Sequence, residues 1–217
     1  AAFEDRFFNE DYWSRYFDML ARDRFNGFVL IFGYENGGYF APAYPYFFDV
    51  EGFPEVRVVD FSRDQQERYL RALNRLIEMA HQRGLQFRVG LWDHIYRGGV
   101  QSGGVKEADA AKPLPGVPWG LTKDNLMAYS RAALAKFLRL VPDLDGVQFR
   151  MHSESGLKPG AEMYDFWKNI YQVVKETRPG LHFDARAKEF PDELIDLALD
   201  MGINIRISTK YWAEQMG

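Results

Sequence analysis

The stretch Gln148-Phe149-Arg150-Met151 alternates polar and apolar side chains. Three more stretches repeat this alternation with an arginine on the polar parity: Gln86-Phe87-Arg88-Val89, Phe183-Asp184-Ala185-Arg186 and Asn204-Ile205-Arg206-Ile207. Successive side chains of a β-strand point to opposite faces, so each stretch predicts a strand with one apolar and one polar face. Strands of a parallel sheet that is covered by helices on both faces are nearly continuously apolar. The pattern therefore favours a barrel with helices outside and a polar interior.

Predicted helices and strands alternate along the whole chain. Helices are expected over about 10–24, 63–82, 123–140, 161–177 and 191–200, and strands over 28–32, 85–92, 146–152, 181–186 and 203–208. Asn9, Ser62 and Thr122 suit the N-caps of the first three helices, and Pro191 suits the first turn of the last one. The sequence therefore predicts an α/β fold with about five parallel strands and five helices.

A complete (β/α)8 TIM barrel has eight strands in about 250 residues. Here the 217 residues open with a predicted helix and stop after a fifth predicted strand. The simplest interpretation is a single, partial TIM-barrel-like domain over residues 1–217, from which the first strand and the last two are missing. Remaining barrel strands or further domains of a longer chain are then expected partners. An open five-stranded α/β sheet is the structural alternative.

Composition excludes several classes of protein. The formal net charge is -4 and 47% of residues are hydrophobic, as in soluble globular domains, and no long basic run suits nucleic acid. Without cysteine, neither disulfides nor a thiolate site is possible. No apolar stretch approaches the roughly 20 residues of a membrane span, and the N-terminus has no signal peptide. We expect no membrane partner, and a location that is cytoplasmic, or extracellular or periplasmic after removal of a signal.

Two long segments join a predicted strand to the next helix, from Gly33 to Phe61 and from Asp93 to Leu121. In parallel α/β folds, loops after the carboxyl ends of strands build the functional site. The first segment contains Tyr34, Tyr39, Phe40, Tyr44, Tyr46, Phe47 and Phe48, and it is interpreted as an ordered binding loop. The second is rich in glycine and proline and is a candidate lid.

The run from Tyr12 to Ala21, followed by Phe25-Asn26-Gly27-Phe28, resembles the helix and strand start of hexosaminidase-type glycoside hydrolases (family 20) and related polysaccharide-degrading barrels. In that family the fourth strand ends in an Asp-Glu pair whose Glu is the general acid. The stretch from Val147 to Gly156 falls at the corresponding place, where Glu154 matches the acid and Ser153 replaces the Asp that orients the acetamido group. The resemblance implies a TIM barrel that acts on carbohydrate.

Glu154 is accordingly predicted to be the general acid. It shares the parity of Arg150 at the carboxyl end of a strand, where barrel enzymes place functional groups. Glycosidases need a second carboxylate, roughly 5–5.5 Å away for retention or 6.5–9.5 Å away for inversion. The candidates are Asp93, Glu35 and Asp184, with Asp93 assigned to the catalytic pair, and missing strands are a further source. Alternatively, Glu154 is an ion-pair partner of an arginine.

Substrate contacts are expected from the aromatic and charged residues at strand ends. An indole stacks on the C–H face of a sugar while nearby polar groups bind its hydroxyls. The excess of arginines over acids suits an acidic sugar, and the alternative is a salt-bridge network closed by carboxylates on absent strands. The predicted substrate-binding residues are Tyr34, Glu35, Trp92, His94, Arg150, His152, Asp184, Arg186, Arg206, Lys210 and Trp212.

No cofactor and no metal are expected. His94 and His152 could form a metal site with Asp93 and Glu154, but no tight ligand motif supports it. The predicted function is a glycoside hydrolase that acts on an oligo- or polysaccharide. A non-catalytic carbohydrate-binding or inactive barrel scaffold is the first alternative, because it needs the aromatic residues but no carboxylate pair. A metal-dependent isomerase or hydrolase is the second.

Overall fold

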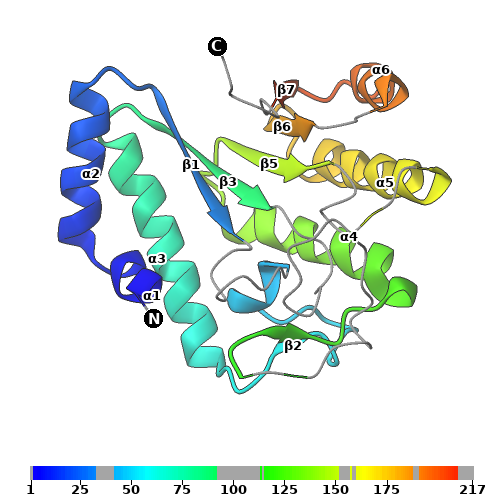
Figure 1. Ribbon diagram of the computed structural model, residues 1–217, viewed down its shortest axis with the longest axis horizontal. Helices are drawn as coiled ribbons and strands as arrows, with labels where there is room; N and C mark the ends of the chain where they lie inside the picture. Colours follow the sequence, from blue (N-terminus) through cyan, green and yellow to red (C-terminus); the bar gives the residue numbers. More distant parts are fainter. Residues whose placement is uncertain are drawn as a thin grey trace, which may run out of the picture.

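The main sheet has five parallel strands. A computed structural model of the protein describes residues 2–32, 42–91, 113, 115–151, 157, 160–187 and 191–209. The strands lie in the order β1-β3-β5-β6-β7, with the bounds Gly27–Phe32, Gln86–Leu91, Gly146–Arg150, His182–Ala187 and Ile205–Thr209. Each strand pairs in parallel with the next one of this sheet along the chain (Figure 1). The sheet is therefore built from consecutive strand–helix units, as predicted.

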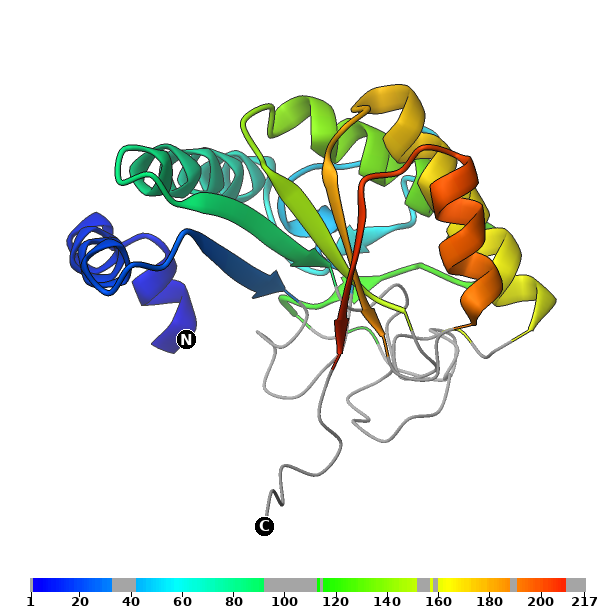
Figure 2. The same ribbon diagram turned by 90° about the horizontal axis from the view of Figure 1, so that it is seen from above.

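The helices lie along one face of this sheet. They are α1 (Ala2–Phe7), α2 (Glu10–Arg22), α3 (Arg63–His81), α4 (Lys123–Leu140), α5 (Ala161–Thr177) and α6 (Asp192–Asp200). Figure 2 shows α2 to α6 arranged around the outside of the sheet, while no helix of the described part covers the opposite face. Five of the six helices match the predicted ones, and α1 was not predicted. The arrangement is that of a barrel wall with one helix layer.

The predicted N-caps explain where the first helices of the strand–helix units begin. Asn9 Oδ1 accepts a hydrogen bond of 2.9 Å from the backbone N–H of Tyr12, at the start of α2. Ser62 and Gln65 form a reciprocal capping box at the start of α3. Such caps typically contribute about 1 kcal/mol each. Pro191 is itself the N-cap of α6, one position earlier than predicted.

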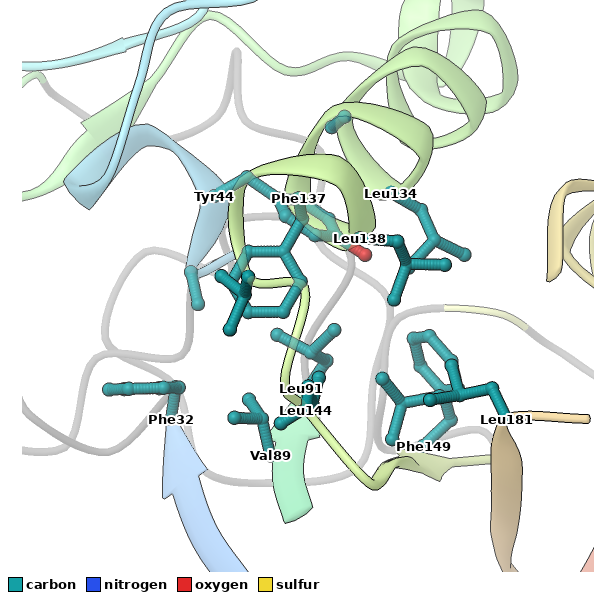
Figure 3. Packing of buried hydrophobic residues seen from close by; sticks show 14 of the residues in the cluster. Phe32, Tyr44, Val89, Leu91, Leu134, Phe137, Leu138, Leu144, Phe149 and Leu181 are labelled. Atoms are coloured by element: carbon teal, nitrogen blue, oxygen red, sulfur yellow. The ribbon is translucent and has the colours of Figure 1, made fainter. Parts of the chain in front are cut away.

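The apolar side chains that alternate along the strands pack under the helices, as predicted. Val89 and Leu91 of β3 and Phe149 of β5 lie beneath α4, whose Leu134 and Phe137 point toward them (Figure 3). The Phe149 ring also contacts Trp167 of α5, with ring centroids 5.5 Å apart. Full burial of side chains of this size contributes about 1.5–3 kcal/mol each. This layer therefore holds the helices on the sheet.

The prediction that Ile207 is buried under a helix is wrong. Its side chain is 45% exposed, whereas Ile205 on the same strand is partly buried against the core. The reason is the position of β7, which is an edge strand of the described sheet and has only β6 as a neighbour.

The two long segments pack against each other. They contain a 3-10 turn, η1 (Tyr44–Tyr46), and two short strands, β2 (Arg57–Val58) and β4 (Pro118–Trp119), which pair antiparallel. The hydroxyl of Tyr46 donates to the carbonyl of Gly116 over 2.8 Å. Gly120 has φ +91°, and a Cβ there would lie 1.9 Å from the carbonyl oxygen of Glu55. Pairing between residues so distant in sequence was not predicted.

The interpretation of the first segment as a binding loop is wrong for residues 44–48. Tyr44, Phe47 and Phe48 are buried, and the rings of Tyr44 and Phe47 contact Phe137 of α4, with centroids 5.9 and 5.8 Å apart. Burial raises the pKa of the Tyr44 hydroxyl well above its ordinary value. These rings are core residues that join η1 to the helix layer. Tyr34, Tyr39, Phe40 and most of the predicted lid lie outside the described residues.

Candidate functional site

Alternate residues of β3, β5, β6 and β7, most of them polar, form the face of the main sheet that lies opposite the helices. We call it the polar face. Parallel register arranges its side chains in three rows, which we call the amino-end, middle and carboxyl-end rows. The amino-end row contains Arg88, Gly146, His182 and Asn204, the middle row Gly90, Gln148, Asp184 and Arg206, and the carboxyl-end row Arg150, Arg186 and Ser208. The arginines therefore share one face, as predicted.

Asp184 is the centre of a hydrogen-bond network in the middle row. Its Oδ2 accepts a bond of 2.9 Å from Gln148 Nε2, and its Oδ1 accepts a bond of 2.6 Å from the hydroxyl of Ser208. Asp184 and Gln148 are both buried. Two neutral donors on the neighbouring strands thus fix both oxygens of the carboxylate, which gives it one orientation before any ligand binds.

The carboxyl-end row places two guanidinium groups on adjacent strands. Arg150 of β5 and Arg186 of β6 are register partners on the same face, and neighbouring strands lie about 4.8 Å apart. Arg150 is only 3% exposed, and Arg186 is half-buried. A planar guanidinium binds a carboxylate through two parallel N–H donors. This row is therefore suited to holding an anionic group, from the protein or from a ligand.

The amino-end row depends on Gly146. A Cβ on Gly146 would lie 2.7 Å from the carbonyl oxygen of His182 and 3.3 Å from Cγ of Arg88, so the neighbouring strands leave no room for a larger residue unless they shift. The side-chain amide of Asn204 lies 2.9 Å from Nδ1 of His182. Desolvation, followed by the charges of Arg206 and Arg88, lowers the pKa of His182 below its ordinary value. The fold therefore favours the neutral imidazole.

The structure brings together those predicted site residues that it describes. Arg150, Asp184 and Arg186 lie side by side at the carboxyl half of the polar face, and Arg206 is an exposed member of its middle row. The other predicted residues lie outside the described part of the chain: Glu154, Asp93, Tyr34, Glu35, Trp92, His94, His152, Lys210 and Trp212.

Sequence reasoning missed two partners of Asp184. Gln148 has the parity of Arg150, and Ser208 has the parity of Arg206 two residues further on. The alternation of polar and apolar residues therefore predicted that both side chains lie on the polar face. It did not predict the register of the strands, which places both side chains against the carboxylate of Asp184.

The described residues contain no cluster of three or more His, Cys, Asp or Glu side chains that could hold a metal ion. None of their helices has both the length and the apolar character needed to cross a membrane.

No protein-family model matches the sequence, and no curated protein matches it. Among solved structures, the chain is similar to a GH138 enzyme targeting pectin rhamnogalacturonan II, with a TM-score of 0.67 and 17% identity over 94% of this chain and 22% of that chain. The chain is also similar to a GH27 β-L-arabinopyranosidase from Geobacillus stearothermophilus, with a TM-score of 0.52 and 13% identity over 94% of this chain and 51% of that chain. A third similar structure is a mutant Streptomyces plicatus beta-hexosaminidase, with a TM-score of 0.51 and 13% identity over 92% of this chain and 44% of that chain.

These similarities establish the fold. The chain has the α/β architecture of TIM-barrel glycoside hydrolases, with a sheet of five parallel strands in the described residues, which confirms the predicted fold class. It spans between 22% and 51% of the length of the three similar chains. The resemblance to hexosaminidase-type barrels noted in the sequence is supported at the level of the fold.

Proposed function

We propose that the protein is a glycoside hydrolase that binds an oligo- or polysaccharide over the carboxyl end of the polar sheet face. The observation that carries this proposal is the pair Arg150 and Arg186 at that end, with Asp184 in the row next to them. Enzymes with TIM-barrel architecture build their sites there, from the loops that follow the strands. The three similar solved structures are carbohydrate-active enzymes by their descriptions, which supports the same class for this chain.

Glu154 is the proposed general acid. It follows the last residue of β5 by four positions, and Asp93 follows the last residue of β3 by two. These strands are neighbours in the sheet, so their carboxyl ends point to the same place. Glu154 donates its proton to the glycosidic oxygen as the bond to the anomeric carbon breaks. As the leaving group departs, Asp93 attacks the anomeric carbon as the nucleophile, and water activated by Glu154 later hydrolyses the glycosyl-enzyme bond; in the inverting alternative, Asp93 takes a proton from the water that attacks this carbon.

Aromatic and polar residues after the strands complete the proposed binding site. Trp92 and Trp212 stack on the apolar faces of sugar rings. Hydrogen bonds to hydroxyl groups come from Tyr34, Glu35, His94, His152, Asp184, Arg206 and Lys210. Because Gln148 and Ser208 hold the carboxylate of Asp184 in place, it binds a hydroxyl group without first being reoriented.

An acidic sugar is the proposed finer specificity. Arg150 and Arg186 lie in register, and two adjacent guanidinium groups suit the carboxylate of a uronic acid. Arg186→Gln should weaken binding of a uronic-acid oligosaccharide about 10–100-fold, as expected for the loss of a charged hydrogen bond. Binding of the matching neutral oligosaccharide should change only a few-fold. Arg71→Gln, on the exposed surface of α3, is the control. Equal effects of Arg186→Gln on both sugars would contradict an acidic substrate.

The catalytic role is tested by Glu154→Gln. The amide keeps the shape of the side chain but has no acidic proton, so turnover should fall about 10²–10⁴-fold while substrate affinity stays within a few-fold. Glu162→Gln, an exposed position in the first turn of α5, is the matched control and should leave both quantities unchanged. A wild-type protein that binds the oligosaccharide without cleaving it would instead be the non-catalytic carbohydrate-binding scaffold.

A further inference from the structure

We infer that the antiparallel ribbon of β2 and β4 is a second sugar-binding site. The indole of Trp119 stacks on a sugar ring there, and the guanidinium of Arg57 binds the carboxylate of the same sugar. This sugar is a residue of the polysaccharide that lies away from the cleaved bond. The inference rests on the proposed function, because the ligand is the same acidic oligo- or polysaccharide.

The ribbon lies at the carboxyl end of the main sheet. β2 belongs to the segment that follows β1, and β4 belongs to the segment that follows β3. Figure 1 and Figure 2 both show the ribbon on the side of the sheet toward which β1 and β3 point. Enzymes with TIM-barrel architecture bind their substrates at that end. The ribbon is therefore on the side of the molecule at which the proposed substrate binds.

One face of the ribbon presents an arginine beside a tryptophan. Arg57 and Trp119 are register partners, so their side chains project from the same face, with Cβ atoms about 4.5–5.5 Å apart. Arg57 is exposed and Trp119 is partly exposed. Val58 and Pro118, which share the other face, are buried. The ribbon thus buries one face in the protein and offers a guanidinium and an indole to a ligand on the other.

Hydrogen bonds at both ends of the ribbon hold it in one conformation. At one end, the backbone N–H of Val59 donates to the carbonyl of Val117 over 3.1 Å. At the other end, Nδ2 of Asn125 donates to Oε1 of Glu55 over 3.1 Å and to the carbonyl of Gly120 over 2.9 Å. A surface that is fixed before binding loses less conformational entropy when a ligand binds. The ribbon is therefore a preorganised binding surface.

The two side chains together suit an acidic sugar. The indole of Trp119 is a flat apolar ring of the kind that stacks on the C–H face of a sugar. Arg57 forms no ion pair with another described residue, so its planar set of N–H donors is available to a carboxylate. The ribbon follows β1 and β3, whereas Arg186 lies on β6, two strand positions or roughly 10 Å from β3. Only a chain of several sugar residues therefore contacts both places.

Ligand length tests the second site. Isothermal titration calorimetry in the Glu154→Gln background measures the affinities for a disaccharide and a hexasaccharide of galacturonic acid. Trp119→Ala should weaken hexasaccharide binding about 10–30-fold, as expected of a tryptophan that anchors a ligand, and change disaccharide binding by less than about 2-fold. Tyr164→Ala, which removes an exposed ring from α5, is the matched control and should change neither affinity. Equal losses on both ligands, or no loss on either, would overturn the inference.

Arg57→Gln separates binding from folding, because an exposed arginine without an ion pair contributes little to stability. It should weaken hexasaccharide binding about 3–10-fold at low ionic strength and less at high salt, with a melting temperature within about 2 °C of the wild type. Trp119→Phe keeps an aromatic ring and should restore most of the affinity that Trp119→Ala loses. Unchanged hexasaccharide binding by Arg57→Gln would overturn the inference and leave the proposed function standing. A wild-type protein that binds neither oligosaccharide would refute the proposed function, and the second site with it.

Discussion

Replacing Gly146 by alanine tests how closely the strands approach at the amino-end row. The added Cβ would lie 2.7 Å from the carbonyl oxygen and 2.8 Å from Cβ of His182, both well inside the 3.4 Å at which ordinary contact begins. These atoms belong to a paired neighbouring strand, so relief requires β5 and β6 to move apart. Overpacking of this kind costs about 1–3 kcal/mol. We expect Gly146→Ala to lower the free energy of unfolding by about 2 kcal/mol.

Gly27→Ala is a matched control, because Gly27 also begins a strand and lies on the same face of the sheet as Gly146. Its nearest neighbours would be ordinary contacts at 3.6 and 3.7 Å. Without strain, the loss of unfolded-state entropy should stabilise this variant by about 0.4–1 kcal/mol. Urea unfolding followed by circular dichroism, with equal m-values for both variants, measures the difference. Equal stabilities of Gly146→Ala and Gly27→Ala would refute the close approach of His182 to Gly146.

Three further predictions follow from individual contacts. Tyr46→Phe removes the bond to the Gly116 carbonyl and should destabilise the protein by about 0.5–1.5 kcal/mol in thermal unfolding, with oligosaccharide affinity unchanged. Gly120→Ala places a Cβ against the Glu55 carbonyl at φ +91° and should cost more than about 3 kcal/mol, and a normal melting curve would contradict the packing of the two long segments. The pKa of His182 is lower in the folded than in the unfolded chain, so the unfolded chain binds more protons near neutral pH. The free energy of unfolding should therefore fall as pH decreases through about 6.5. His182→Gln should reduce this loss between pH 7 and 5 and leave the pH dependence above pH 8 unchanged.

The sequence was sufficient to predict which face of each strand is polar, because the alternation of side chains is a local property of the strand. This is why Arg150 and Arg186 were correctly placed together, and why Val89 and Phe149 were correctly placed under helices. The caps at Asn9 and Ser62 were predictable for the same reason, since a cap contacts residues three positions away.

Features that depend on distant partners were not predictable. Tyr44 looked like part of a binding loop, and its burial depends on Phe137, which lies on a helix far along the chain. The exposure of Ile207 depends on which strands stand beside β7, and alternation within a strand does not contain that information. The fixing of Asp184 by Gln148 and Ser208 likewise required the register of three strands.

The central claim, that Glu154 protonates the leaving group, is tested most directly by changing the leaving group. Wild type and Glu154→Gln should be compared on a natural oligosaccharide and on an aryl glycoside of the same sugar with an acidic phenol. A phenolate departs without protonation, so the substitution should reduce turnover of the oligosaccharide about 10²–10⁴-fold and that of the aryl glycoside much less. Near-normal turnover of the oligosaccharide by Glu154→Gln, or equal losses on both substrates, would contradict the assignment of Glu154 as the general acid.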